Sequence, residues 1–412
     1  MIKKALKDEF VKNNIILFSG SMVVAVLNYI YHPVLSRMMS VENFGEVQAL
    51  ISIFLQSGVI LGVFGTIVTN ITTNHQEEKL SVINQLYKIA LISSLILTLA
   101  IFLFTPFLKN FLQFHSVASF WALAISLPLS IDLTFRRFYL QGKKRFKEIS
   151  VVGILFAGGR LFFAITLVWL GWKTFGAIVS LTLTTITSLI YLYWKTHREF
   201  KLSLKEKIVF NSELKEEFKY AGLILAVTGF ITFLYTADMI FVKHYFSPEQ
   251  AGFYGGIATI ARIIFFVTGS VTGVLIASVK IKNTFRENAL VLKKGLMIIS
   301  LIGLSATSIF FFFPNLVIKL MIGARYLPEA FLLPRMAVVL FLTSVINMVL
   351  MYFLALRKYF IIKLVVIIIT LITLLTIFHH QEMADIVNNF LVGTIIMISI
   401  LAVRVYQMRK GK

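Results

Sequence analysis

The chain has 412 residues, of which 58% are hydrophobic and only 14% are charged, and its mean hydropathy is +0.86. Soluble domains are about 45–50% apolar and about 25% charged, so this composition excludes a water-soluble globule and predicts a membrane protein. There is no cysteine, which excludes disulfides and thiolate metal sites.

Twelve long apolar runs follow one another along the chain, each near the roughly 20 residues that a membrane helix requires. They predict an all-α polytopic membrane protein with twelve transmembrane helices. The runs cover residues 14–33, 47–69, 87–108, 117–133, 149–170, 175–194, 220–242, 253–279, 295–313, 330–353, 360–378 and 386–403.

The basic residues divide unequally between the two sides that twelve spans would create. The net charge is +21, which in a soluble protein would suggest a nucleic-acid partner. Here 31 of the 40 basic residues lie on the side that carries both termini and 7 lie on the other side. Because Lys and Arg accumulate in cytoplasmic loops, this predicts that both termini are cytoplasmic and that no nucleic acid is bound.

The chain contains a weak internal duplication. Residues 35–50 align without gaps on residues 242–257, and residues 138–146 align on residues 352–360. The aligned identities are Ser40, Glu42 and Gly45 with Ser247, Glu249 and Gly252. Each block falls at the same place in its half, which predicts two six-helix bundles related by a pseudo-twofold axis along the membrane normal.

This duplication sets the expected domains. We expect an N-terminal six-helix bundle over residues 1–194, a cytoplasmic linker over 195–219 and a C-terminal six-helix bundle over 220–412. The linker has seven basic and five acidic residues spaced among apolar ones. It is interpreted either as an amphipathic helix on the anionic inner membrane surface or as a solvated linker.

Two glycine pairs fall at equivalent places in the halves. Residues 58–62 and 269–273 both read G-x-x-x-G. Such spacing lets membrane helices approach closely, so we expect helix contacts at both.

No catalytic or metal-binding pattern occurs: the sequence lacks Walker A, H-E-x-x-H, G-x-S-x-G, EF-hand and Cys/His metal motifs. It therefore predicts neither an enzyme nor a metal site. Two arginines, Arg160 and Arg262, lie inside predicted spans, where a charge costs several kcal/mol and marks an interior cavity by default. Each either faces a substrate or forms a buried structural pair.

A second group of charged residues lies near the ends of the spans. Arg37, Lys243 and His244 follow the first and seventh runs and either draw in an anionic head group or anchor the interface. Asp238 and Asp132 are candidates for proton or sodium sites, or for counter-ions to the arginines.

Four stretches make the sequence recognisable. The motifs are S-P-E-x-A-G-x-Y at 247–254 and G-x-x-Y-L at 323–327, with supporting similarity at 35–50 and 138–150. In these the chain resembles the polysaccharide transporter family, the O-antigen, capsular and exopolysaccharide flippases of the multidrug/oligosaccharidyl-lipid/polysaccharide (MOP) superfamily. The resemblance implies a fold like that of the MATE transporters.

The resemblance also implies a function. It indicates a flippase of the bacterial cytoplasmic membrane that moves undecaprenyl-pyrophosphate-linked oligosaccharide to the outer leaflet by alternating access, through a cavity in which Arg160, Arg262 and Arg37 bind the substrate. No cofactor is implied beyond possible coupling to H⁺ or Na⁺, and the implied partners are membrane lipids, a polysaccharide polymerase and glycosyltransferases. The alternatives are a cation-coupled multidrug antiporter of the same superfamily and a non-transporting scaffold of a polysaccharide assembly complex.

Overall fold

The protein, described by a computed structural model, is entirely helical in the part that the structure describes. This part comprises residues 9–73, 80–205, 212–276, 278–280 and 282–409. The chain divides into two compact units, and one helix, α3 (Val41–Thr73), is shared between them. The first unit contains Met1–Asn43 and Ser57–Ala221, and the second contains Phe44–Gln56 and Gly222–Lys412.

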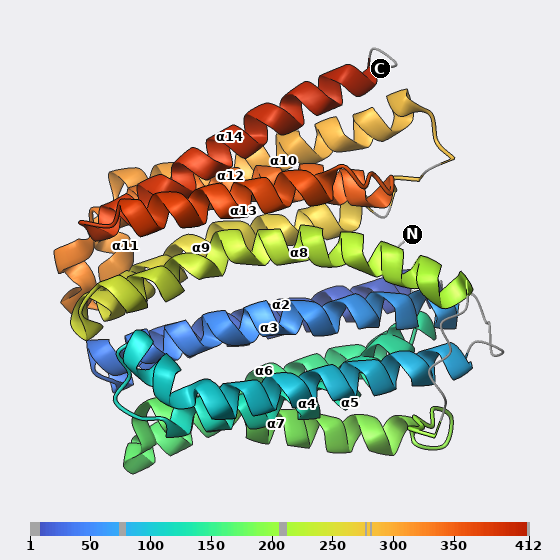
Figure 1. Ribbon diagram of the computed structural model, residues 1–412, viewed down its shortest axis with the longest axis horizontal. Coiled ribbons are helices and arrows are strands. Elements are labelled where there is room, and N and C mark those ends of the chain that lie inside the picture. Colours follow the sequence, from blue (N-terminus) through green and yellow to red (C-terminus); the bar gives the residue numbers. More distant parts are fainter. Residues whose placement is uncertain (1–8, 74–79, 206–211, 277, 281, 410–412) are drawn as a thin grey trace. The chain divides into compact units, whose positions relative to one another are not determined.

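In the first unit, long helices pack both against the next helix along the chain and against helices further away in the sequence (Figure 1). α6 packs against both α2 and α7, and α5 packs against both α4 and α7. Besides part of α3, the helices are α2 (Glu9–Met38), α4 (Leu80–Phe111), α5 (Ala118–Gly142), α6 (Phe146–Leu167) and α7 (Lys173–Thr196).

The second unit is organised around one central helix, α12, which packs against α9, α10 and α14. α12 is the most deeply buried of the candidate membrane spans, with 72% of its apolar window inside the protein. The helices are α8 (Ser212–Tyr245), α9 (Pro248–Ile276), α10 (Phe285–Phe312), α11 (Pro314–Met321), α12 (Leu332–Ala355), α13 (Ile361–Phe378) and α14 (Met383–Arg409).

Among the described residues, ten helical segments are long and apolar enough to cross a membrane. One of them, Phe146–Thr196, is 51 residues long and contains both α6 and α7. A π-helical turn at Val168–Trp172 separates these two, and its Gly171 has a φ of +87°, a conformation that glycine adopts without strain. The length of this segment allows two crossings, because a single crossing needs about 20 residues.

The two repeat blocks begin their helices in the same way. The hydroxyl oxygen of Ser40 accepts a hydrogen bond from the backbone N–H of Asn43 (3.3 Å), and that of Ser247 accepts one from Gln250 (3.3 Å). Each serine therefore satisfies one of the free N–H groups at a helix start. The repeated glutamates, Glu42 and Glu249, lie in the first turns of α3 and α9, where a negative charge is favourable.

Local structure also explains the G-x-x-Y-L motif. Gly323 has a φ of +106° and precedes a short 3₁₀ helix, Ala324–Glu329. The turn directs Tyr326 into the second unit, where its side chain is fully buried. There its ring lies over Gly256 so closely that a Cβ on that glycine would be 2.6 Å from the ring carbons.

In the described part of the linker, residues 197–205 do not form the amphipathic helix that is one of the two interpretations of this segment. They follow an irregular path in which the backbone N–H of Ser203 donates to Asn84 (3.1 Å) and the ring of Phe200 stacks on Tyr139 (4.2 Å). Residues 206–211 lie outside the described part, and α8 begins at Ser212.

The two G-x-x-x-G pairs make no close helix contact within their own units. Among the described residues, a Cβ added to Gly58, Gly62, Gly269 or Gly273 would meet no atom within 4 Å. Gly20 and Gly303 do pack closely against neighbouring side chains, although neither belongs to either pair.

Candidate functional site

Arg160 lies in the membrane-spanning part of the first unit, on α6. It follows the first residue of that helix by 14 positions, or about 21 Å at 1.5 Å per residue. Small residues hold α6 against its neighbours: a Cβ on Gly20 of α2 would be 2.5 Å from the Ser150 hydroxyl, and one on Gly159 would be 2.5 Å from the Thr184 hydroxyl. The glycine that precedes Arg160 therefore admits α7.

The Arg160 guanidinium contacts an aromatic ring and no carboxylate. Its Cζ atom lies 3.9 Å from the centroid of the Tyr31 ring, on α2. Its Nε is buried without a hydrogen-bond partner. Within the described residues no Asp or Glu oxygen approaches it to within 4.0 Å. No carboxylate in the described part of the chain therefore compensates this positive charge.

This arrangement suits an anion. A cation–π contact stabilises a guanidinium by about 0.5–2 kcal/mol but leaves its charge and its N–H donors in place. A planar guanidinium can present two parallel N–H donors to a phosphate or carboxylate. In a site with little water such a contact would also offset the cost of keeping the charge within the bundle.

Arg262 has a different environment, in the second unit. It is the central residue of α9, deeper than its predicted position nine residues into a span. Its Nη2 lies 3.1 Å from Oδ1 of Asp238 on α8, and the Tyr254 hydroxyl donates to Oδ2 of the same carboxylate (3.0 Å). The Arg262 and Asp238 side chains are only 7% and 11% exposed.

The pair is therefore internally neutral. Asp238 is the counter-ion of Arg262, one of the two roles that the sequence left open for it. An anion could bind Arg262 only by displacing Asp238 or after Asp238 had been protonated. Arg262 Nε has no hydrogen-bond partner, so the pair still holds one unsatisfied donor.

The basic residues near the ends of the first and seventh runs are not equivalent. Arg37 is exposed, belongs to the first unit, and donates from Nη1 to the carbonyl of Pro33 (3.0 Å). Lys243 is fully buried within the second unit. His244 is half-buried, with its ring 4.5 Å from that of Tyr245. Of the three, Arg37 is the only one whose side chain is exposed.

Asp132 forms an ion pair within α5. Its Oδ1 accepts a hydrogen bond from Nε of Arg136 (2.9 Å), one helical turn later. The helix extends beyond the span predicted over 117–133, because α5 continues to Gly142 and so includes Arg136. Arg136 is only 5% exposed, and its Nη1 donates to the Thr196 hydroxyl (2.7 Å) and the Phe200 carbonyl (3.3 Å).

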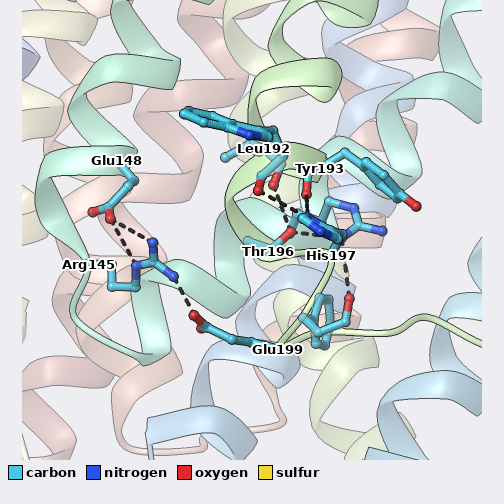
Figure 2. A network of polar contacts seen from close by, with 10 residues as sticks. Arg145, Glu148, Leu192, Tyr193, Thr196, His197 and Glu199 are labelled. Atoms are coloured by element: carbon cyan, nitrogen blue, oxygen red, sulfur yellow. Dashed lines mark hydrogen bonds and ion pairs between the residues drawn. The ribbon is translucent and has the colours of Figure 1, made fainter.

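A second arginine extends this polar cluster (Figure 2). Arg145 donates to Glu148 (2.7 Å) and to Glu199 (3.2 Å), and so ties the chain after α7 to the start of α6. Partial burial acts to lower the pKa of Arg145, but the hydrogen bond and charge of Glu148 and the charge of Glu199 raise it above its usual value. Asp132, Arg136 and Arg145 thus hold the end of the first unit together.

Sequence reasoning offered Asp238 as a counter-ion to the arginines but missed Tyr254 beside it and Tyr31 beside Arg160. Asp238 and Tyr254 lie at nearly equal distances on either side of the turn between α8 and α9, so the antiparallel hairpin could have predicted their contact. Tyr31 and Arg160 are far apart in sequence, and no local pattern indicates that α2 and α6 meet there.

Comparison with known proteins agrees with this architecture. A family model described as "Polysaccharide biosynthesis protein" matches residues 10–277. No curated protein matches the sequence.

Solved structures match over nearly the whole chain. An inward-facing MATE-family multidrug resistance transporter of the MOP superfamily matches with a TM-score of 0.69 at 14% identity, covering 96% of this chain and 99% of that one. The lipid II flippase MurJ, in an inward closed conformation, matches with a TM-score of 0.72 at 13% identity, covering 95% and 87%. The MATE multidrug transporter DinF-BH matches with a TM-score of 0.67 at 12% identity, covering 98% and 96%. At these identities the likeness concerns the fold.

Proposed function

Since the chain belongs to the polysaccharide biosynthesis protein family and is a multi-pass membrane protein with the fold of MOP transporters rather than of enzymes, we propose that it is a flippase for polyprenyl-pyrophosphate-linked oligosaccharides. It would move these units from the cytoplasmic to the outer leaflet of the bacterial cytoplasmic membrane for the synthesis of a surface polysaccharide such as O-antigen or capsule. A polymerase and glycosyltransferases would use and supply the same lipid-linked units.

Arg160 is the observation that carries this proposal. A deep guanidinium with no carboxylate partner is costly in a membrane protein unless a ligand uses it. A pyrophosphate that must cross the bilayer needs such donors, and arginine binds it with two parallel hydrogen bonds. The polyprenyl tail can remain in lipid while the sugars occupy a wet cavity.

We further propose twelve spans in two six-helix bundles, with both termini in the cytoplasm. The ten membrane-spanning segments become twelve when α2 is added and Phe146–Thr196 is counted as α6 and α7. The excess of basic residues on the side of the termini supports the orientation. The two repeats would rock about the substrate in alternating access.

In this proposal Asp238 couples transport to protons. It holds Arg262 in a buried pair, so protonation of the carboxylate would release the guanidinium for the pyrophosphate. Proton and substrate would then act together at Arg262. The exposed Arg37 would attract the anionic head group at the outer face. Lys243, which is buried, and His244 would contribute only within the second unit. Asp132 would remain the counter-ion of Arg136.

Complementation tests the proposal. In a strain that lacks the gene, Arg160→Ala should abolish surface polysaccharide at normal protein abundance, and Arg160→Lys should restore part of it because an ammonium lacks the bidentate geometry. The matched control is Arg198→Ala, which removes an exposed arginine outside the spans. Full activity of Arg160→Ala would contradict the substrate role.

The same strains separate the flippase from the alternatives. A cation-coupled drug antiporter predicts lost resistance to cationic drugs with intact polysaccharide export. A scaffold predicts that Arg160→Ala and Arg262→Ala both keep export whenever the protein is present. The flippase predicts lost export with unchanged drug resistance.

A further inference from the structure

A long groove runs along the second unit between α10 and α14. Both helices pack against α12, which supplies the floor through Val345 and Val349. The groove has two adjoining parts of about 700 and 430 Å³ that share Ala289, Leu292, Leu296 and Val405. Together they form one open surface groove, which is called the channel below.

The channel is apolar over most of its length. Its α10 wall runs from Ala289 to Leu304, and the 15 steps between these residues span about 22 Å at 1.5 Å per residue. That length exceeds one leaflet of hydrocarbon, about 15 Å. Met297 and Leu301 on this wall are 62% and 71% exposed. In a membrane these surfaces meet lipid chains.

Two cations lie at one end of the channel. Lys293 and Arg409 belong to its lining, Lys293 in the first half of α10 and Arg409 at the last turn of α14. Among the described residues neither has a carboxylate within 4.0 Å. The acidic residue nearest in sequence, Glu287, is occupied by the capping box of α10, where it accepts from the Thr284 backbone N–H (2.8 Å).

We propose that this channel binds an anionic phospholipid of the cytoplasmic leaflet. Lys293 and Arg409 would hold the phosphate and head group, and one acyl chain would lie along Leu296, Met297 and Leu304. Basic pockets between membrane helices on the cytoplasmic side recognise anionic lipid head groups. The choice of an anionic lipid rests on the two cations, which have no carboxylate partner among the described residues, and the choice of leaflet rests on the orientation proposed above. The inference does not depend on the transported substrate.

Native mass spectrometry of the full-length protein tests the site. The purified protein is titrated with phosphatidylglycerol and, separately, with phosphatidylcholine of the same acyl chains. Phosphatidylglycerol should bind more tightly, and Lys293→Gln with Arg409→Gln should weaken it by roughly 30-fold, since each cation contributes about a fivefold gain. Phosphatidylcholine binding should change little.

Two further variants control for charge and for the channel itself. Lys358→Gln with Lys363→Gln removes the same charge from exposed residues at the cytoplasmic side of α13 and should keep the lipid preference. Ala289→Trp should reduce binding of both lipids by filling the channel without changing its charge. Equal binding of the two lipids by the wild type, or equal losses in the two double variants, would overturn the proposal. Displacement of phosphatidylglycerol by equimolar polyprenyl phosphate would also overturn it, by assigning the channel to the transported lipid.

Discussion

Gly45 and Gly252, the equivalent glycines of the two repeat blocks, lie directly against each other: a Cβ added to Gly45 would be 2.7 Å from the Cα of Gly252. Both belong to the second unit, because the start of α3 packs there. A side chain at Gly45 would therefore clash with the equivalent glycine of the other repeat.

Gly45→Ala should therefore destabilise the protein by about 1–3 kcal/mol, the usual cost of overpacking, because the atoms that the new methyl group meets are backbone atoms. Thermal unfolding in detergent measures this. Gly58→Ala, on the same helix but with open space around it, is the control and should be neutral or stabilising by up to about 1 kcal/mol. Equal effects of the two substitutions would refute the close contact.

The Asp238–Arg262 pair makes a sharper prediction. Asp238→Leu or Arg262→Met alone should cost about 3–5 kcal/mol, because each leaves a buried charge without its partner. The double variant should recover most of this loss, since it removes both charges. Tyr254→Phe should cost about 1.5–3 kcal/mol, the usual range for a hydrogen bond to a charged group. Additive effects in the cycle, measured by thermal unfolding, would show that the pair does not form.

Arg136 and Arg145 should differ in importance although both are ion-paired. Arg136 is buried and donates hydrogen bonds to Asp132, Thr196 and Phe200. Arg136→Ala should therefore lower the free energy of unfolding by about 3–5 kcal/mol. Arg145 is partly exposed, and Arg145→Ala should cost no more than about 1 kcal/mol. Limited proteolysis of the segment after α7 should show the same order, with faster cleavage in Arg136→Ala than in Arg145→Ala. A larger loss for Arg145→Ala would contradict this account of the cluster.

The ring of Tyr31 supports the Arg160 guanidinium through its face. Tyr31→Phe keeps that face and should leave polysaccharide export close to wild type. Tyr31→Leu removes it and should lower export by a factor that corresponds to about 0.5–2 kcal/mol. Export by complementation, normalised to protein abundance, measures both variants. A stronger effect of Tyr31→Phe would indicate that the hydroxyl, and not the ring, is required.

The sequence predicted the membrane helices and the family because both depend on patterns within single segments. Apolar runs reveal spans, and the aligned Ser40 and Ser247 mark the repeat whose helix starts they cap in the structure. What the sequence could not predict depends on what lies across from a residue. Within its unit the glycine pair at 58–62 faces open space, and the buried Arg136 donates hydrogen bonds to Thr196 and Phe200. Local spacing encodes neither arrangement.

The two deep arginines illustrate the same limit. Depth alone made Arg160 and Arg262 equal candidates for substrate binding. Their neighbours separate them, because Asp238 neutralises Arg262 while the Arg160 guanidinium lies over the uncharged Tyr31 ring and has no carboxylate within 4.0 Å among the described residues. In the proposed mechanism the substrate role therefore falls first on Arg160, and that of Arg262 would depend on the protonation of its partner.

The central claim is that Arg160 carries the pyrophosphate across the bilayer. The most direct measurement is the transbilayer movement of a polyprenyl-pyrophosphate-linked oligosaccharide in proteoliposomes, assayed by the access of an external lectin or glycosidase to its sugars. The account predicts rapid movement with the wild type and with Arg198→Ala, partial movement with Arg160→Lys, and none above protein-free liposomes with Arg160→Ala. Movement by Arg160→Ala at the wild-type rate would contradict it.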